Sequence, residues 1–259
     1  MKNVLIVGIN SYIGSNLKKY LIKKKINVIG TTHKKADVQN NIYYLNLKKP
    51  KLNFLNIKID AAIVCASITN VQICELAPNK TKKINVINTI KLLKYLNSHS
   101  IFNLFISSNL VFNGKKPFNS AKDKPKPVSK YGKYKLQVEK FINSKKSKNY
   151  SVLRLTKVIS NDSKFIRYLR SKINKRKILN YESDYFLSPI KIDRVCNVIY
   201  KILKKKHNGL FQLGGKKEYN LDKFVHYYFS EKNILTKNQN KTKIKWKNYH
   251  NSLKTSLPF

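Results

Sequence analysis

The chain opens on a strand, a glycine-containing turn and a helix, and alternation of this kind continues through most of its length. Residues 3–8 read Asn-Val-Leu-Ile-Val-Gly, a short apolar run, and residues 12–25 have amphipathic helical periodicity. Further strand-like runs lie at residues 26–30, 42–45, 61–66, 102–107, 151–155 and 209–213, with helical patterns at 79–97 and 129–144. Strands that alternate with helices predict a parallel sheet covered on both faces.

We therefore predict an α/β protein with a doubly wound parallel sheet and a small C-terminal lobe. The domain built on the sheet is expected to span residues 1–156. Residues 157–259 change character, with shorter helical patches between lysine-rich polar loops, and are expected to form mainly the second lobe. The strand near residues 209–213 is expected to return to the main sheet.

The turn after the first strand has the spacing of a dinucleotide-binding turn, with one departure. Gly8 and Gly14 match the outer glycines, but Ser11 stands in place of the middle one. A pyrophosphate needs a tight turn, close approach of the backbone and a helix N-terminus directed at it. An ordinary β-α turn is the alternative. The expected cofactor contacts in this turn are Gly8, Asn10, Ser11, Tyr12, Ile13 and Gly14.

The segment after the second strand bears on the choice of cofactor. An acidic residue about 20 residues beyond the glycines binds the ribose of NAD, whereas basic or hydroxyl groups accept the 2′-phosphate of NADP. Residues 30–35 read Gly-Thr-Thr-His-Lys-Lys and contain no carboxylate, so NADP(H) is expected and NAD(H) is the alternative. Because lysine is frequent everywhere, the missing acid is the stronger half of the argument. The expected contacts here are Thr31, Thr32, His33 and Lys34.

Tyr131 and Lys135 are the main candidates for acid-base chemistry. Positions i and i+4 of a helix share a face, so the two side chains should point the same way. A neighbouring ammonium favours the phenolate, and we expect it to lower the tyrosine pKa from its ordinary value of about 10. Ser107 and Ser108 end the strand run upstream, and a serine hydroxyl there would hold a substrate oxygen.

The spacing Tyr-x-x-x-Lys carries weight only together with its surroundings, because it also occurs at Tyr20/Lys24, Tyr44/Lys48, Tyr168/Lys172, Tyr200/Lys204, Tyr219/Lys223 and Tyr228/Lys232. Around Tyr131, further segments follow in a fixed order. They are the turn at residues 8–14, Cys-Ala-Ser-Ile-Thr-Asn-Val at 65–71 with Cys74-Glu75, Ser-Ser-Asn-Leu-Val-Phe-Asn-Gly at 107–114, and Tyr-Gly-Lys-Tyr-Lys-Leu at 131–136 with Glu139. In this order the chain resembles the extended short-chain dehydrogenase/reductase family, and within it the dTDP-4-dehydrorhamnose reductase-like sugar-nucleotide group.

The resemblance implies that residues 1–156 form an NAD(P)-binding Rossmann domain and that residues 157–259 form mainly a substrate-binding lobe. The same resemblance implies a reductase triad of Ser108, Tyr131 and Lys135. NADPH would reduce the C4 carbonyl of a nucleotide-linked 4-keto-6-deoxy sugar, with Tyr131 as proton donor and Ser108 hydrogen-bonded to the developing alkoxide. It also implies cofactor contacts by Cys65, Ala66, Ser67, Asn85, Ser107, Tyr131 and Lys135, and substrate contacts by Thr69, Asn109 and Arg154. Its pathway would be polysaccharide biosynthesis.

Departures from the family pattern leave other functions open. Asn109-Leu110 replaces an Asp-Tyr pair and Tyr249-His250 replaces an Arg-Pro pair, so the sugar and its nucleotide are not determined. An NAD(P)-dependent epimerase or dehydratase on the same scaffold is one alternative, although Asn109 after Ser108 favours simple reduction. A non-catalytic dinucleotide-binding regulatory protein is another, which the imperfect glycine turn suits and the intact triad opposes.

The net charge of +42 raises the question of nucleic-acid binding. The lysines are spread along the whole chain and no nucleic-acid-binding motif occurs, so neither DNA nor RNA is an expected partner. No apolar stretch reaches the ~18 residues of a membrane span and no signal peptide is recognisable, so we expect a cytoplasmic protein without membrane association.

The cysteines and histidines predict no metal site. Cys65, Cys74 and Cys196 lack the spacing of metal ligands, and the five histidines form no cluster in the sequence. The resemblance also implies a homodimer formed by the helices near residues 79–97 and 129–144, and the apolar stripe of the first helix would suit that contact.

Overall fold

The computed structural model describes residues 1–52, 57–144, 149–181, 184–230, 236–238 and 249–259. Its centre is a seven-stranded sheet in the order β11-β6-β5-β4-β1-β2-β3, and every neighbouring pair is parallel. The strands are β1 (Asn3–Val7), β2 (Asn27–Thr32), β3 (Ile42–Tyr44), β4 (Ala61–Val64), β5 (Phe102–Ser108), β6 (Tyr150–Leu155) and β11 (Gly209–Leu213). The predicted Rossmann-type, doubly wound fold is therefore confirmed.

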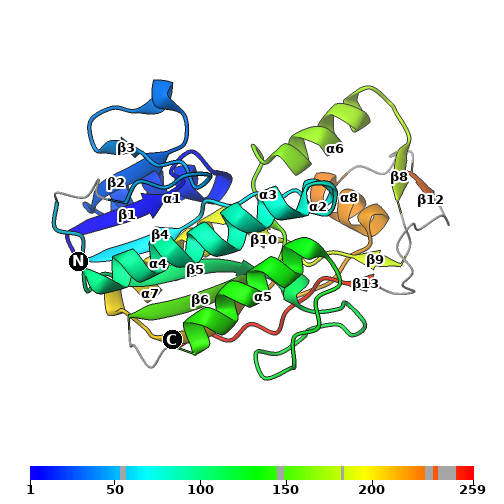
Figure 1. Ribbon diagram of the computed structural model, residues 1–259. Coiled ribbons are helices and arrows are strands. Elements are labelled where there is room, and N and C mark those ends of the chain that lie inside the picture. The colour runs from blue at the N-terminus through cyan, green and yellow to red at the C-terminus, as the bar shows by residue number, and fades with distance from the viewer. Residues whose placement is uncertain (53–56, 145–148, 182–183, 231–235, 239–248) are drawn as a thin grey trace.

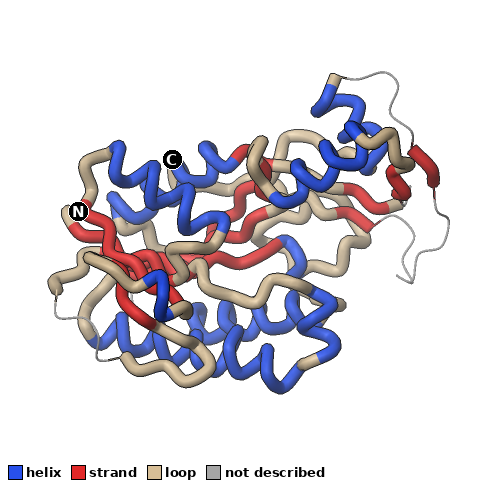
Figure 2. Tube along the Cα trace, turned by 90° about the horizontal axis from the view of Figure 1, so that it is seen from above, coloured by secondary structure: helices blue, strands red, loops and turns tan. Residues whose placement is uncertain are grey.

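Helices cover both faces of this sheet, as Figure 2 shows with strands between two helical layers. On one face lie α1 (Tyr12–Lys23) and α7 (Ile192–Lys205), and on the other α4 (Thr89–Ser98) and α5 (Lys130–Asn143). Successive strand residues point to opposite faces, so Val4 and Ile6 join the first layer whereas Leu5 and Val7 join the second. Burial on both faces explains why the strands read as continuous apolar runs.

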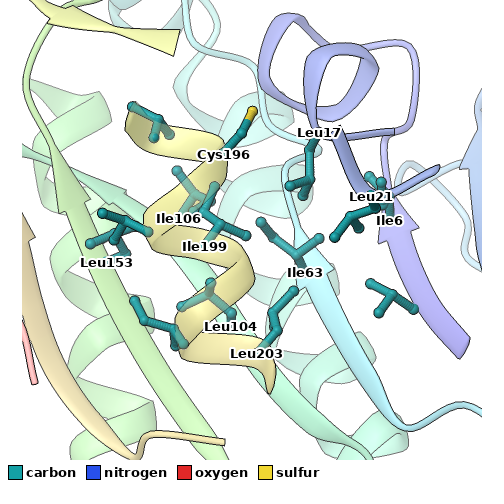
Figure 3. Packing of buried hydrophobic residues seen from close by; sticks show 14 of the residues in the cluster. Ile6, Leu17, Leu21, Ile63, Leu104, Ile106, Leu153, Cys196, Ile199 and Leu203 are labelled. Carbon is teal, nitrogen blue, oxygen red and sulfur yellow. The ribbon is translucent and has the colours of Figure 1, made fainter. Parts of the chain in front are cut away.

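Buried apolar side chains fill the layer between the sheet and α7 (Figure 3). Ile199 and Leu203 of α7 and Leu21 of α1 are 0% exposed, and strand residues such as Ile63 and Leu104 pack in the same cluster. This core holds the sheet in place, and with it the carboxyl ends of the strands.

A smaller lobe lies beyond the carboxyl ends of the strands, on the right in Figure 1. It has its own apolar cluster, which includes Ile166, Leu169, Phe224 and Val225. Its elements are β7 (Val158–Ile159), α6 (Lys164–Asn174), β8 (Leu179–Tyr181), β9 (Tyr185–Phe186), β10 (Ile190–Lys191), α8 (Leu221–Phe229), β12 (Thr236–Asn238) and β13 (Tyr249–His250). Three parallel strand pairs, β10-β7, β12-β8 and β13-β9, connect them.

The predicted helix over residues 79–97 is present as a run of three helical segments. After α2 (Val71–Leu76) the chain forms α3 (Pro78–Lys82), the π-helix η2 (Lys83–Asn88) and α4. Its apolar stripe packs mainly inside this chain, because Ile84, Leu93 and Leu96 are buried in the core against the sheet. The stripe therefore does not by itself argue for a dimer. No helix in the described ranges combines the length and hydropathy needed to cross a membrane.

We expect Ile199→Ala to lower the free energy of unfolding by about 2–5 kcal/mol, because the truncation leaves a cavity in a fully buried layer. Urea unfolding monitored by circular dichroism measures the change. Lys205→Ala, at an exposed position of the same helix, is the matched control and should change the free energy by less than about 0.5 kcal/mol. Equal effects of the two substitutions would contradict the assigned packing of α7.

Candidate active site

The predicted site residues follow the carboxyl ends of neighbouring parallel strands. The strand order runs from β1 through β2 to β3 in one direction and from β4 through β5 to β6 in the other. In open α/β sheets, ligands bind in the crevice where the order reverses, here between β1 and β4. Gly8 follows β1 and Cys65 follows β4, and the N–H groups of Cys65 and Ala66 both donate to Val7 O, at 3.0 and 2.9 Å. The two strand ends thus meet at the switch point.

The conformation of the turn explains why Ser11 can stand in place of the middle glycine. Gly8 has φ of +85°, and a Cβ at that position would lie 2.9 Å from Ala66, so glycine is required there. Ser11 has φ of −68° and needs no glycine, and its Oγ accepts a hydrogen bond from Gly14 N at 3.1 Å, which caps α1. The first turn of α1 contains no acidic residue. Its N-terminus therefore suits an anion, and the turn fits the pyrophosphate of a dinucleotide.

Two other residues of the turn point elsewhere. The Tyr12 hydroxyl donates to Ser160 Oγ at 2.8 Å, which ties the start of α1 to the smaller lobe. Ile13 is half-buried and packs against the core cluster under α1. Their direct contacts with a cofactor stay predictions, since both side chains already have structural partners.

Asn85 anchors the loop that follows β4. The residue lies in η2 and is 3% exposed, and its Oδ1 accepts from Ile68 N at 2.8 Å and from Ser67 Oγ at 3.1 Å. Its Nδ2 donates to Ile68 O at 2.9 Å. π-Helical turns often occur at functional sites because they redirect a side chain. Asn85 thus positions the loop that carries Ser67 and the exposed Thr69, and its own contact with a cofactor stays a prediction.

Close packing brings α5 against the end of β5. Ser108 ends β5, where its Oγ accepts from Leu110 N at 3.2 Å and donates to Asn109 Oδ1 at 3.2 Å, capping the 3₁₀-helix η3 (Asn109–Val111). A Cβ on Gly132 would lie 2.0 Å from Leu110 O. Glycine at this position therefore lets α5 approach η3 and places Tyr131 near the Ser108 segment.

Tyr131 and Lys135 share a buried face of α5, as the i, i+4 spacing predicts. They are 8% and 5% exposed. Lys135 Nζ donates to Ile106 O at 2.9 Å and lies 5.5 Å from the centre of the Tyr131 ring and 4.7 Å from that of Phe105. Within the described residues, nothing hydrogen-bonds to the Tyr131 hydroxyl. The ammonium therefore lies over the aromatic rings and is held by the β5 backbone.

The expected lowering of the Tyr131 pKa is wrong for this arrangement. Burial raises the pKa of Tyr131 above its ordinary value, and the nearby Cys74 adds to the effect. Burial also lowers the pKa of Lys135 to about 8, although Cys65, Glu139 and Cys74 oppose the change. Desolvation is thus the largest cause of the pKa shift for both groups. At neutral pH the phenol keeps its proton, which is the state that a proton donor requires.

A buried ion pair behind the triad was not foreseen from the sequence. Glu139, one turn after Lys135, is 1% exposed and pairs with Arg154 of β6, which is 2% exposed. Arg154 Nη2 lies 2.7 Å from Glu139 Oε2, and Arg154 Nε donates to Oε1 at 3.1 Å. The Ser107 hydroxyl also donates to Glu139 Oε1. Ser107 thus supports the carboxylate, and its cofactor contact stays a prediction.

Arg154 extends this buried network toward the C-terminal segment. Besides Glu139, its guanidinium bonds Gln212 Oε1 at 3.1 Å through Nη1 and lies 5.0 Å from the Phe112 ring centre. Gln212 Nε2 in turn donates to the carbonyl oxygens of Asn119 and Lys254, at 2.9 and 3.1 Å. The described contacts of the guanidinium thus hold the chain together, and its substrate contact stays a prediction.

Asn109 connects the end of β5 to the smaller lobe. Its Nδ2 donates to Asn251 Oδ1 at 2.7 Å, and Asn251 Nδ2 donates to Phe186 O in β9 at 2.9 Å. The next residue, His250, lies 2.7 Å from Glu218 through Nδ1 and stacks on Phe186 at 4.9 Å between ring centres. The lobe is thus held beside the end of β5. Substrate contacts by Asn109 and Thr69 stay predictions.

The end of β2 contains a carboxylate that the sequence argument overlooked. Thr31 Oγ1 accepts from Gly8 N at 3.2 Å, while His33 and Lys34 are exposed. Beyond residues 30–35, the 3₁₀-helix η1 (Lys35–Asp37) folds back, and Asn10 Nδ2 donates to Asp37 Oδ2 at 2.7 Å. The statement that no acid is available at this strand end is therefore wrong. The spacing of about 20 residues beyond Gly14 was the signal that could have indicated it.

No group of three or more His, Cys, Asp or Glu side chains suited to a metal ion occurs in the part of the chain that the structure describes.

Comparisons with known proteins bear on the family and the fold of the chain. The sequence pattern of the RmlD substrate binding domain matches residues 1–253. Among curated proteins, methionine adenosyltransferase 2 subunit beta of Xenopus tropicalis is 27% identical over 144 residues, which cover 54% of this chain and 42% of that protein. The chain thus matches less than half the length of this relative.

Solved structures share the fold over nearly the whole chain. A hypothetical dTDP-4-dehydrorhamnose reductase from Sulfolobus tokodaii is 22% identical with a TM-score of 0.85, covering 98% of this chain and 92% of that one. The dTDP-4-dehydrorhamnose reductase of Bacillus anthracis, in complex with NADP, is 18% identical with a TM-score of 0.85, covering 99% and 92%. UDP-glucose 4-epimerase of Thermotoga maritima, with UDP-glucose, is 18% identical with a TM-score of 0.78, covering 98% and 90%. At these identities the likeness establishes the fold.

We expect Glu139→Gln to lower the free energy of unfolding by about 3–5 kcal/mol, because it leaves the Arg154 charge buried and unpaired. The double variant Glu139→Leu/Arg154→Met removes both charges and should be less destabilised than Glu139→Gln alone. Thermal and urea unfolding of the wild type and the two variants measure this difference. A double variant that loses as much stability as Glu139→Gln, or more, would contradict the coupling of the pair.

Proposed function

The chain belongs to the RmlD substrate binding domain family, and from this premise we propose that it reduces the C4 carbonyl of a nucleotide-linked 4-keto-6-deoxy sugar. The observation that carries the proposal is the placement of Tyr131 and Lys135 on one buried face of α5, next to the Ser108 end of β5. The family relationship and the fold support an oxidoreductase that uses a nicotinamide cofactor.

The residues of the strand ends divide the work of binding. The turn from Gly8 to Gly14 and the N-terminus of α1 would hold the cofactor pyrophosphate, and the Ser67 loop anchored by Asn85 would lie beside it. When bound, the reduced nicotinamide supplies a hydride for the C4 carbon. Lys135 would hold the nicotinamide ribose, and the segment that joins Asn109 to Asn251 would border the sugar.

Tyr131 is the proposed acid. Its phenol keeps its proton at neutral pH because burial raises its pKa. As the C4 carbonyl is reduced, its oxygen takes the proton from the Tyr131 hydroxyl and becomes the C4 hydroxyl, while Ser108 Oγ donates a hydrogen bond to the same oxygen. The Lys135 ammonium, held over the tyrosine ring, stabilises the phenolate that remains.

Two other functions are consistent with some of these features of the chain. A nucleotide-sugar epimerase or dehydratase would share the fold, as the Thermotoga epimerase does, but Asn109 rather than an acid follows Ser108. A non-catalytic dinucleotide-binding regulatory protein is the other alternative, and one curated relative, methionine adenosyltransferase 2 subunit beta, is named as a subunit. The intact triad favours catalysis over regulation. A cytoplasmic homodimer in polysaccharide biosynthesis is the setting that the family resemblance suggests.

We expect Tyr131→Phe to lower kcat by about 10²–10⁴-fold, because it removes the proton donor without changing the shape of the ring. The assay follows oxidation of the reduced cofactor with a dTDP-4-keto-6-deoxy sugar. Tyr134→Phe is the matched control, since that buried phenol on the same helix donates to Pro78 O and lies outside the proposed chemistry. If Tyr131→Phe turns over as fast as the control, the assignment of the acid is wrong.

The pH dependence of kcat/KM should report Lys135. Burial lowers its pKa to about 8, and the protonated form is the one that stabilises the phenolate, so kcat/KM should be high below that pH and fall as pH rises through it. Lys135→Arg retains the charge at higher pH and should remove this fall, even at a lower rate. A fall at the same pH in both proteins would assign the titration to another group.

A further inference from the structure

The segment after β2 turns back onto the glycine turn and carries a carboxylate there. Asn10 Nδ2 donates to Asp37 Oδ2 at 2.7 Å and lies 3.4 Å from Thr32 Oγ1, which in turn lies 3.5 Å from Asp37 Oδ2. Thr32 Oγ1 also accepts from Lys34 N at 3.2 Å, which fixes the start of the turn. Two segments therefore hold one oxygen of Asp37: the glycine turn through Asn10 and the end of β2 through Thr32.

The second oxygen of this carboxylate is left for another partner. Within the described residues, no group hydrogen-bonds to Asp37 Oδ1. Asp37 is half-buried and Asn10 is exposed, so the pair lies at the protein surface and not in the core. A carboxylate fixed through one oxygen presents the other as a pre-oriented hydrogen-bond acceptor.

The position of Asp37 Oδ1 determines which part of a bound dinucleotide it would contact. It lies between the ends of β1 and β2, beside the N-terminus of α1 to which we assign the pyrophosphate. The adenosine ribose of a dinucleotide lies next to its pyrophosphate on the side of the second strand, where an acid accepts from the ribose 2′-hydroxyl. A 2′-phosphate at that position would place like charges together and would leave the carboxylate without its donor.

We propose that Asp37 selects a nicotinamide cofactor with a free 2′-hydroxyl, so that this chain binds NADH more tightly than NADPH. This reverses the expectation drawn from residues 30–35. The lysines that supported NADP(H), Lys34 and Lys35, are exposed side chains in water, whereas Asp37 is held at the crevice by Asn10. The inference rests on the proposed function only for the identity of the ligand as a dinucleotide.

Titration calorimetry of the full chain with NADH and with NADPH, in the absence of any sugar, tests the proposal. The wild-type protein should bind NADH at least about tenfold more tightly than NADPH. Asp37→Asn removes the charge but keeps an acceptor for Asn10, and should tighten NADPH so that the ratio falls by about tenfold. Asp37→Ala also removes the acceptor and should weaken NADH.

The control is Asp193→Asn, which removes the same charge from an exposed acid in the first turn of α7 and should leave the NADH to NADPH ratio unchanged. Wild-type preference for NADPH, or a ratio that does not move in the Asp37 variants, overturns the proposal. Selective NADH binding without turnover of any keto-sugar nucleotide would support Asp37 and contradict the reductase. Turnover of a keto-sugar nucleotide with a preference for NADPH would support the reductase and contradict the role of Asp37.

Discussion

The pairing of Glu139 with Arg154 in the core is the interaction on which the catalytic geometry depends. Two charges this deeply buried would be strongly destabilising if either were alone, so the pair fixes α5 against β6 in one position. Lys135, one turn earlier on the same helix, holds the β5 backbone at Ile106. Since Ser107 bonds the same carboxylate, the helix that carries Tyr131 and the strand that ends in Ser108 are held in one register. Gln212 extends the network to the C-terminal segment near Lys254.

Burial also decides which protonation states the site offers. A tyrosine and a lysine in contact with water would attract each other only weakly, but here both lose hydration, and each is pushed toward its neutral form. For the phenol the neutral form is the acid, which suits reduction of a carbonyl. The carboxylate of Glu139 opposes the shift of Lys135 and so helps to retain its charge. The same buried face of α5 therefore contributes both to the packing of the core and to the protonation states of Tyr131 and Lys135.

The sequence predicted the features that depend on local spacing. Apolar runs with β-branched residues became the strands, and the i, i+4 relation of Tyr131 and Lys135 was confirmed because a helix imposes it. Features that depend on contacts between distant parts of the chain were missed. The pairing of Arg154 with Glu139 was not predicted because nothing in the segment of Arg154 shows that Glu139 lies opposite. Asp37 was overlooked because a 3₁₀ turn, not the strand, brings it to Asn10, and the Tyr131 pKa was misjudged because desolvation is a property of the packed core.

Net hydride transfer to the sugar is the central claim, and isotope transfer tests it most directly. The protein would be incubated with a reduced nicotinamide cofactor that carries deuterium at both C4 positions of its ring and with a dTDP-4-keto-6-deoxy sugar, and the product examined by NMR and mass spectrometry. A reductase places deuterium on C4 of the sugar, one atom for each cofactor oxidised. A sugar product that carries no deuterium, or turnover without net cofactor oxidation, would contradict the account and favour an epimerase or dehydratase.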